Sequence, residues 1–295
     1  MKCYRLGIDE IPTFHRLTLL LGNFDGCHRG HYELVKEAKI KGEGDLGVLF
    51  FEGNPASILH HKSEKVLTST DDKIRLFSSF GFDATFLLPL STDILQKSKE
   101  EFLEQYLEPL HPFLVVVGED YSFGYKGEGK VKDLVLKFPT SVVPLLSENG
   151  CKIGTQEIIH LLESGNVEEA NRELGRAYEI HGKVSHGLQN GRKIGFPTAN
   201  LELDTPYVLP HAGVYKTLSY VRGIPHLSLT NVGNNPTIGV LKHPVIETFI
   251  EGFQGEIYGE TLYVSFLSFL REEKKFSSLD ELKKQIEIDK THLFD

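Results

Sequence analysis

The feature of this sequence that most limits its fold is an alternation between short apolar runs and helical patterns, which begins at residue 17 and continues to about residue 145. The runs LTLLLG (17–22) and LGVLFF (46–51) contain hardly any polar residues, whereas STDDKIRLFSSFG (69–81) has its apolar residues at helical spacing. Continuous apolar strands that alternate with amphipathic helices are typical of a parallel sheet covered by helices on both faces. We therefore expect the first half to be a doubly wound, Rossmann-like α/β domain.

After about residue 178 the pattern changes to alternating or β-branched runs that Gly, Pro and Asn separate. Examples are YEIHGKV (178–184), GVYKTLSYV (213–221) and TLYVSFLSFL (261–270). Short strands at this spacing predict a small antiparallel β-barrel. A helical pattern closes the chain, with Ser278 and Glu281 at the spacing of a capping box.

This change of pattern predicts two domains, in agreement with the length of 295 residues. The N-terminal α/β domain is expected to comprise residues 1–175, and the C-terminal barrel with its terminal helix residues 176–295. Two short helical patterns between residues 156 and 176 are interpreted as a connector. The second of them has Asn166 and Glu169 at capping-box spacing.

Charge and cysteine content disfavour several classes of protein. The net charge is −9, and no basic block resembles a nucleic-acid footprint. Cys3, Cys27 and Cys151 are an odd number at wide spacing, which fits neither a disulfide framework nor a Cys-x-x-Cys metal site, so a reducing, cytoplasmic location is expected. The sequence has no signal-peptide core and no run of about eighteen apolar residues, so no membrane association is expected.

The stretch GNFDGCHRGH (22–31) lies where the first apolar run ends and a helical pattern begins. At such a junction a parallel sheet opens a crevice and the helix offers unpaired N–H groups, which suits a phosphate. His28 and His31 are three residues apart, so they share a face of the first helical turn and can donate hydrogen bonds to that phosphate. Zinc is disfavoured, because only Cys27 is near enough to add a ligand. The residues expected around the phosphate are Gly22, Asn23, Asp25, Gly26 and Gly30.

This stretch resembles the Gly-x-Phe-Asp-Gly-x-His-x-Gly-His signature of the nucleotidylyltransferase half of the prokaryotic bifunctional riboflavin kinase/FMN adenylyltransferases, or FAD synthetases. GEDYSFGYKGEG (118–129) is similar to the family's Gly-x-Asp-Phe-x-Phe-Gly stretch. The resemblance implies that His28 and His31 help the phosphate of FMN react at the α-phosphate of ATP, which gives FAD and pyrophosphate. It also implies that Asp120 and Phe123 border the flavin or nucleotide cleft.

In the second half, GRKIGFPTANL (191–201) joins a glycine turn to a proline and then to two small oxygen-bearing side chains, Thr198 and Asn200. Residues i and i+2 of an extended segment point the same way, so both oxygens can meet one hard cation such as Mg²⁺. Taken alone, the pattern fits an ordinary β-turn that enters a strand at least as well.

Four segments together resemble the riboflavin kinase domain, in order and over its whole length: GRKIGFPTANL, LTNVGNNPTIG (229–239), VIETFI (245–250) and residues 258–289. The resemblance implies that this domain phosphorylates riboflavin to FMN with Mg-ATP, and that Glu247 accepts the proton of the ribityl 5′-hydroxyl. The other implied site residues are Thr198 and Asn200 for Mg²⁺ with ATP, Gly195 and Pro197 in the phosphate loop, and Asn231 and Arg271 at the cleft.

The first half departs from the family pattern at two places. The family usually has a Phe-x-Pro-His-Pro segment where this chain has Asn54 in place of the histidine, and arginines where it has Glu157 and Ile159. A glutamate about 4 Å from a phosphate charge adds about 1 to 4 kcal/mol of repulsion, which is enough for a large loss of rate. Alternatively, another cation supplies the missing charge; the candidates are Lys126, Lys130 and Lys152.

We therefore expect a cytoplasmic enzyme of flavin biosynthesis that acts on small molecules, makes FMN and adenylylates it to FAD, and exists as a monomer or weak homo-oligomer. One alternative is a riboflavin kinase whose first domain is impaired in adenylyl transfer. An alternative of another class is a non-catalytic flavin-binding or regulatory protein, against which the presence of a base at Glu247 argues.

Overall fold

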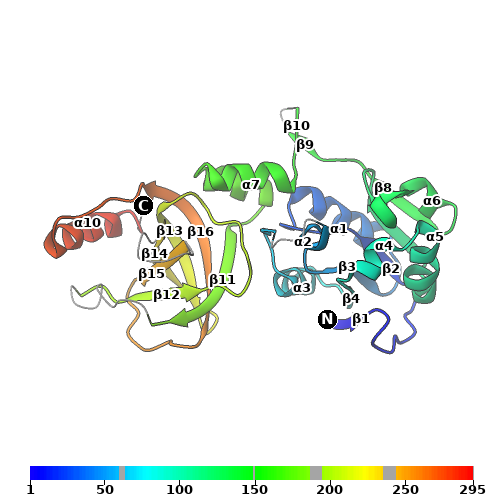
Figure 1. Cartoon of the computed structure of the whole chain (residues 1–295), viewed down its shortest axis with the longest axis horizontal. Helices are drawn as coiled ribbons and strands as arrows, with labels where there is room; N and C mark the ends of the chain where they lie inside the picture. Colours follow the sequence, from blue (N-terminus) through cyan, green and yellow to red (C-terminus); the bar gives the residue numbers. More distant parts are fainter. Residues whose placement is uncertain (60–63, 149, 187–194, 235–243, 295) are drawn as a thin grey trace. The chain divides into compact units, whose positions relative to one another are not determined.

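The computed structural model describes residues 1–59, 64–148, 150–186, 195–234 and 244–294 (Figure 1). Its internal contacts divide the chain into two compact units, Met1–Thr155 and Gln156–Asp295, which are described separately here. Parts of two predicted motifs, residues 191–194 and 235–239, lie outside the described residues. No helix in the described part of the chain is both long and apolar enough to cross a membrane.

The first unit is built on a six-stranded sheet in which every neighbouring pair is parallel, which confirms the predicted α/β architecture. The strand order is β1-β4-β3-β2-β5-β8, so β3 and β4 lie on one side of β2, and β5 and β8 lie on the other. The strands are β1 (Lys2–Arg5), β2 (Thr18–Leu21), β3 (Leu46–Glu52), β4 (Ala84–Pro89), β5 (Leu114–Gly118) and β8 (Thr140–Val143).

Helices connect these strands and bury two apolar clusters against the sheet. Side chains of β2 contribute to both clusters, because successive residues of a strand point to opposite faces: Leu19 and Leu21 belong to one cluster and Leu20 to the other. The helices are α1 (Arg29–Lys41), α2 (Pro55–Leu59), α3 (Thr70–Ser79), α4 (Thr92–Gln96), α5 (Lys99–Phe102) and α6 (Val131–Val135). A π-helical turn, Leu103–Leu107, continues α5. Two short antiparallel pairs complete the unit, β6 (Ser122–Phe123) with β7 (Gly129–Lys130) and β9 (Ser147–Glu148) with β10 (Cys151–Lys152).

The second unit contains a closed antiparallel barrel in the order β11-β12-β15-β14-β13-β16, which confirms the predicted barrel. Its strands are β11 (Tyr178–Ser185), β12 (Thr198–Glu202), β13 (Gly213–Val221), β14 (Ile224–Asn234), β15 (Pro244–Ile250) and β16 (Thr261–Arg271). Alternate residues of β15 point inward, with Ile246, Thr248 and Ile250 buried. Glu247 and Phe249 therefore lie on the outer face of the barrel wall.

Helices α7 (Thr155–Glu163) and α8 (Val167–Leu174) precede the barrel, and α10 (Leu279–Thr291) follows it, as predicted. The capping box expected at Asn166 is wrong: Asn166 has φ −87° and ψ 65°, and its side chain makes no cap hydrogen bond. Ser278 does cap α10 by accepting from the Glu281 N–H, but the Glu281 carboxylate accepts from Ser277, one residue earlier than a capping box requires.

Candidate functional site

The GNFDGCHRGH stretch joins β2 to α1 at the point where the order of the sheet reverses. β3 and β4 lie on one side of β2, and β5 and β8 lie on the other. In doubly wound sheets ligands bind in the crevice at the carboxyl ends of the strands at this position. The segment that contains Asp120 and Phe123 follows β5, the neighbour of β2, so both predicted first-half motifs follow adjacent strands.

The first turn of α1 brings His28 and His31 together, which confirms that they share a face. Their rings stack with centroids 3.7 Å apart and planes inclined by 22°. Gly30 makes room for this arrangement, because a Cβ at that position would lie 3.1 Å from Cε1 and Nδ1 of the His28 ring. His28 is buried, with 7% exposed, and His31 is half-buried. Their roles in adenylyl transfer stay predictions.

Local packing explains two of the predicted glycines. A Cβ on Gly22 would lie 2.8 Å from the ring of Phe24, which is completely buried. Gly26 has φ +83°, a conformation that glycine adopts without steric penalty. The buried thiol of Cys27 donates to the Phe24 carbonyl at 3.2 Å, whereas Asn23 is exposed.

The Asp25 carboxylate is directed into the protein. Oδ1 accepts the N–H groups of Leu67 and Thr68, both at 3.0 Å, and the Thr68 hydroxyl at 3.1 Å. Only 7% of Asp25 is exposed. These contacts fix the junction to the segment that precedes α3, and a contact of Asp25 with phosphate stays a prediction.

The last residues of the first unit also contact the junction between β2 and α1. The Thr155 hydroxyl donates to the Asp25 carbonyl at 3.1 Å. Lys152, one of the candidate cations, forms an exposed ion pair with Asp120 at 2.8 Å. Phe123 is 5% exposed and packs on Phe102, with ring centroids 5.5 Å apart, so it contributes to the core. The roles of Asp120 and Phe123 at a cleft stay predictions.

The residues at which this chain departs from the family pattern lie in helices or at the start of one. Asn54 starts α2, since its side-chain oxygen accepts the Ala56 N–H at 3.0 Å. Glu157 and Ile159 lie in α7, which belongs to the second unit.

The barrel places the predicted kinase residues in one row. Glu247 of β15 pairs directly with Asn200 of β12 on one side and with Asn231 of β14 on the other. Directly opposed residues of antiparallel strands share a face and have Cβ atoms about 5 Å apart. Thr198 lies two residues before Asn200 on β12 and therefore on the same face. The sequence predicted these four residues from three separate segments, and strand pairing brings them together.

A cavity of about 270 Å³ opens over this row, between the barrel wall and α10. Four predicted residues line it: Thr198, Asn231, Glu247 and Arg271. Apolar side chains form much of the remaining wall, including Phe249 and Phe276, together with Leu282 and Ile286 of α10. Leu282 and Ile286 are four residues apart and therefore share the face of α10 that lines this cavity. The cavity combines a largely apolar surface with several polar and charged side chains, including Glu273 and Lys274, and such a lining suits a small molecule.

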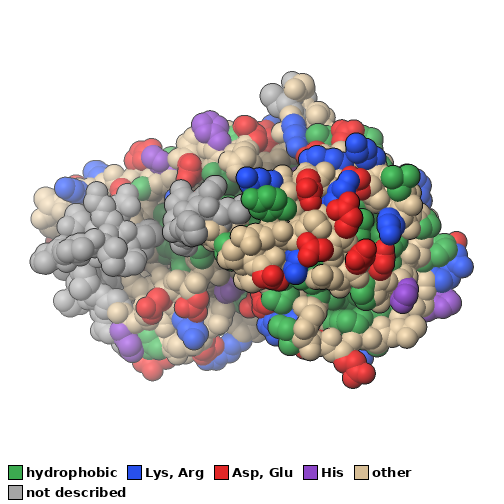
Figure 2. All heavy atoms as spheres, turned by 45° about the vertical axis from the view of Figure 1, so that its right-hand side comes forward, with side chains coloured by type: hydrophobic (Ala, Val, Ile, Leu, Met, Phe, Trp, Pro, Cys, Tyr) green, Lys and Arg blue, Asp and Glu red, His purple; other side chains and the backbone are tan. Residues whose placement is uncertain are grey.

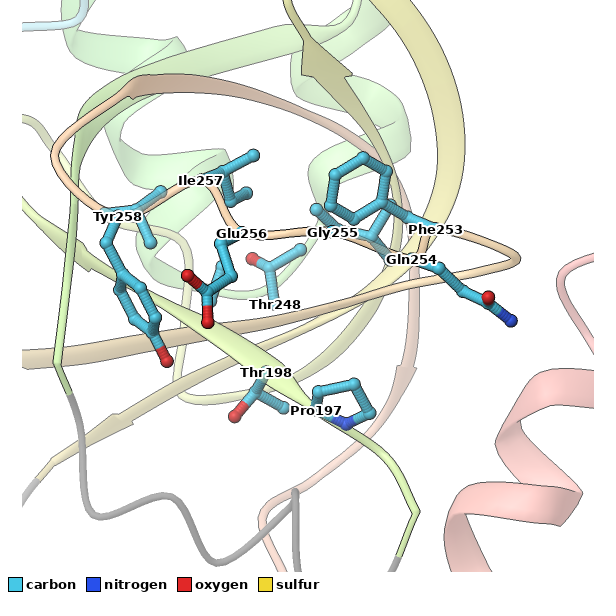
Figure 3. Close-up of a pocket in the computed structure, with 12 residues that line it drawn as sticks. Pro197, Thr198, Thr248, Phe253, Gln254, Gly255, Glu256, Ile257 and Tyr258 are labelled. Carbon is cyan, nitrogen blue, oxygen red and sulfur yellow. The ribbon is translucent and has the colours of Figure 1, made fainter.

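A second cavity, of about 260 Å³, also has Thr198 in its lining (Figure 3). Pro197, Thr198 and Thr248 line it, together with the loop 253–258. In Figure 3 the polar ends of Thr198, Glu256 and Tyr258 project into the same part of this cavity. Thr198 is therefore shared by two cavities, and Glu247 lines only the first.

The segment that enters β12 is held by aromatic contacts. Gly195 has φ +88°, with open space around it, so a glycine turn precedes Phe196. Phe196 is buried and meets Phe249 edge to face, with ring centroids 5.3 Å apart. The ammonium of Lys290, from α10, lies 5.5 Å and 5.6 Å from these two rings. This packing fixes Pro197 and Thr198 relative to Glu247.

Burial raises the pKa of the Glu247 carboxyl above its ordinary value. No other cause contributes to the shift, which reflects the apolar wall of the cavity. A carboxylate whose pKa is closer to neutrality is a better proton acceptor near pH 7.

Arg271 lines the first cavity but is also committed to α10. Its Nε lies 3.0 Å from both carboxylate oxygens of Asp289, and its Nη2 lies 2.8 Å from Oδ2. Asp289 is 3% exposed and also accepts from Gln285. Sequence reasoning missed Asp289 because nothing in its helical pattern distinguishes it from the exposed acids of α10. A contact between Arg271 and a ligand stays a prediction.

The fold and the two sites define a class: an enzyme with a nucleotidyltransferase-like α/β unit followed by a barrel that carries a kinase-like site. Residues 11–156 match the family model for FAD synthetase, and residues 174–294 match the model for riboflavin kinase. The chain belongs to the bifunctional riboflavin kinase/FMN adenylyltransferase family, whose reactions make flavin cofactors.

Relatives support this membership over nearly the whole chain. The bifunctional riboflavin kinase/FMN adenylyltransferase of Listeria monocytogenes is 37% identical over 95% of this chain and 92% of its own length. The Bacillus subtilis enzyme of the same name is 34% identical over 92% and 90%. A crystal structure from Streptococcus pneumoniae, described as a macrolide-efflux protein, has 28% identity and a TM-score of 0.87, and the match covers 99% of each chain.

Proposed function

We propose that the second unit transfers the γ-phosphoryl group of ATP to riboflavin, with Glu247 as the base. The ribityl 5′-oxygen forms a bond to the γ-phosphorus, its proton passes to Glu247, and the bond to the β,γ-bridging oxygen breaks to release ADP. The row Asn200–Glu247–Asn231 carries this proposal, because it puts a half-buried carboxylate between two amides in a cavity with a largely apolar surface. Such a transfer depends mainly on positioning and on charge neutralisation.

The two cavities divide the substrates between them. The flavin occupies the cavity beside α10, where the apolar wall covers its ring system and Glu247 meets the ribityl hydroxyl. The nucleotide occupies the cavity of loop 253–258, where Phe253 and Tyr258 suit a base. Thr198 lines both cavities, so the γ-phosphate lies at Thr198, between donor and acceptor.

The residues of β12 fit a magnesium ion that accompanies ATP. Thr198 offers a hydroxyl and Asn200 an amide oxygen on the same face, and both are half-buried hard donors of the kind that Mg²⁺ prefers. When bound with ATP, Mg²⁺ neutralises phosphate charge. Gly195 and Pro197 shape the backbone that approaches the phosphates.

We propose that the first unit adenylylates FMN, which gives FAD. An oxygen of the FMN phosphate bonds to the α-phosphorus of ATP, and the bond to the α,β-bridging oxygen breaks to release pyrophosphate. His28 and His31 stabilise the charge on the α-phosphate, while the backbone around Gly22, Gly26 and Gly30 admits the phosphates. The stacked pair of imidazoles at the switch point of the sheet supports this assignment.

We also propose that this enzyme works in the cytoplasm on small molecules alone, without nucleic acid or membrane, as a monomer or weak homo-oligomer. The net charge of −9 disfavours nucleic-acid binding. Acidic and basic side chains are interspersed over the face shown in Figure 2.

The test supplies purified protein with Mg-ATP and either riboflavin or FMN, and follows the products by chromatography. FMN from riboflavin and FAD from FMN are expected. FMN without FAD would support a kinase with an impaired first unit, which Asn54, Glu157 and Ile159 motivate. If neither substrate gave a product, the result would support the alternative of a non-catalytic flavin-binding or regulatory protein.

A further inference from the structure

The turn beneath the histidines has an unusual backbone. Phe24, Gly26 and Cys27 have φ values of +53°, +83° and +41°, so two residues with side chains adopt the left-handed region within four positions. Such conformations are strained and persist only when surrounding contacts hold them. Phe24 and Cys27 therefore need partners that fix the turn.

Thr68 supplies the most direct of these contacts. Its hydroxyl donates to Asp25 Oδ1 at 3.1 Å and accepts the Gly26 N–H at 2.9 Å, so it closes a small ring over the turn. Its own N–H also donates to Asp25 Oδ1. Thr68 is 5% exposed and lies 43 residues from Asp25, outside every motif that the sequence reveals.

Lys73, in the first turns of α3, supplies a buried charge close to the same turn. It is 3% exposed, and its ammonium lies 5.3 Å from the centre of the Phe50 ring. Phe50 in turn meets Phe24 of the turn edge to face, with ring centroids 6.5 Å apart. Burial lowers the pKa of Lys73, and the neighbouring Asp25 carboxylate opposes this change. Burial likewise raises the pKa of Asp25, and Lys73 is the largest opposing influence. Each charge thus favours the ionised state of the other.

We propose that Thr68 and Lys73 are positioning residues for adenylyl transfer, which act through Asp25 to hold the turn that presents His28 and His31 to the α-phosphate. Neither residue touches the substrates in this role. The inference rests on the proposed adenylyltransferase function of the first unit. It predicts that the hydroxyl of Thr68 matters more than its methyl group, and that Lys73 matters only while Asp25 is charged.

The first test compares Thr68→Val, which keeps the shape and loses the hydroxyl, with Thr68→Ser, which keeps the hydroxyl and loses the methyl. Thr68→Val is expected to lower kcat for FAD formation about 10- to 100-fold with a smaller change in the KM for ATP, since small misplacements of reacting groups cost this much. Thr68→Ser should stay close to wild type. FMN formation by the second unit is the internal control in each variant.

Thr18→Val is the matched control. Thr18 is completely buried in β2, and its hydroxyl has no hydrogen-bond partner among the described residues, so the same substitution should leave FAD formation unchanged. If Thr68→Ser loses more activity than Thr68→Val, or if the two Thr→Val variants behave alike, Thr68 acts by packing and the proposal fails. A wild-type chain that makes FMN but no FAD would instead overturn the proposed function of the first unit.

The second test uses the pair of charges. Lys73→Met leaves the Asp25 carboxylate buried without its cation, so kcat for FAD formation should fall at least about tenfold. Adding Asp25→Asn removes the uncompensated charge and should restore part of the lost rate. Absence of rescue, together with a raised KM for ATP, would show that Lys73 acts on the substrate itself and would overturn the proposal.

Discussion

Glu247 meets two requirements that oppose each other. As the proposed base it must be ionised and close to the ribityl hydroxyl, yet burial beside the cavity penalises its charge. The sequence around it, VIETFI, has the pattern of an ordinary alternating strand and does not indicate that burial opposes the charge of Glu247. Only the barrel, by pairing β15 with β12 and β14, makes it the centre of a polar row.

Replacing Glu247 should separate catalysis from folding. Glu247→Gln keeps the shape and removes the base, so FMN formation should fall about a hundredfold to ten-thousandfold. FAD formation from supplied FMN should continue, because it belongs to the first unit. Glu202→Gln, an exposed acid of β12, is the control and should leave both reactions unchanged. Near-normal FMN formation by Glu247→Gln would remove Glu247 from the mechanism.

The same residue predicts a pH dependence. Because burial raises the folded-state pKa of Glu247, the kinase rate should fall on acidification at a pH above the ordinary glutamate value of about 4.3. A raised folded-state pKa also means that the ionised carboxylate destabilises the fold fully above that pKa, and that this penalty fades as the pH falls to the lower, unfolded-state pKa. Glu247→Gln should therefore raise the unfolding temperature at pH 7, with a smaller gain near pH 4. Calorimetry at both values checks the sign, and an equal gain at both would contradict it.

At the scale of elements, α10 forms one wall of the cavity proposed for the flavin. Ion pairs of Asp289 with Arg271 and of Lys290 with Glu251 hold this helix to the barrel. Arg271 at the end of β16 forms a bidentate ion pair with Asp289 of α10. Leu282 and Ile286 of the same helix line the cavity. Because the helix makes part of the binding surface, its attachment should affect affinity for the flavin more than the chemical step.

Removing the acid of this pair tests that idea. Asp289→Ala leaves Arg271 without its partner, so the free energy of unfolding should fall by about 3 kcal/mol and the KM for riboflavin should rise more than kcat falls. The control is Glu260→Ala, which breaks a similar contact with Arg222 on the exposed surface of the same barrel and should change little. An unchanged KM for riboflavin in Asp289→Ala would mean that α10 does not border the flavin.

For the whole molecule, sequence patterns predict what lies within an element and fail for contacts between distant elements. Apolar periodicity predicts the parallel sheet and the barrel, and the His28–His31 spacing predicts a shared helical face that the stacked rings confirm. The sequence patterns did not reveal Thr68 and Asp289. Their hydrogen-bond partners Asp25 and Arg271 lie 43 and 18 residues away along the chain, where residue spacing carries no information. The predicted capping box at Asn166 was wrong, because the backbone angles at Asn166 decide whether its side chain can reach the N–H groups of the helix.

The division into two units raises the question whether α8 belongs to the folding unit of the barrel. The sequence assigns it to a connector ahead of a boundary at residue 176, whereas the contacts group it with the barrel. Its Asn171 side chain donates to the Phe266 carbonyl at 2.8 Å and accepts the Tyr178 N–H at 2.6 Å, so it bridges β16 and β11. Its apolar residues Val167, Ala170 and Leu174 are buried.

Two fragments of the second unit decide the point. A fragment of residues 156–295 should fold alone and phosphorylate riboflavin at close to the rate of the full chain, because it keeps the barrel, α10 and α8, which packs on β16. A fragment of residues 176–295 lacks both α7 and α8. The loss of α8 exposes apolar surface of the barrel and leaves two backbone groups without their Asn171 partner. Its free energy of unfolding should be lower by at least about 3 kcal/mol, from lost apolar burial and hydrogen bonds. Urea titration of both fragments, with FMN formation as the second readout, measures the difference. Equal stability would place the folding boundary at residue 176 and make α8 dispensable, whereas the predicted loss would make α8 part of the kinase unit.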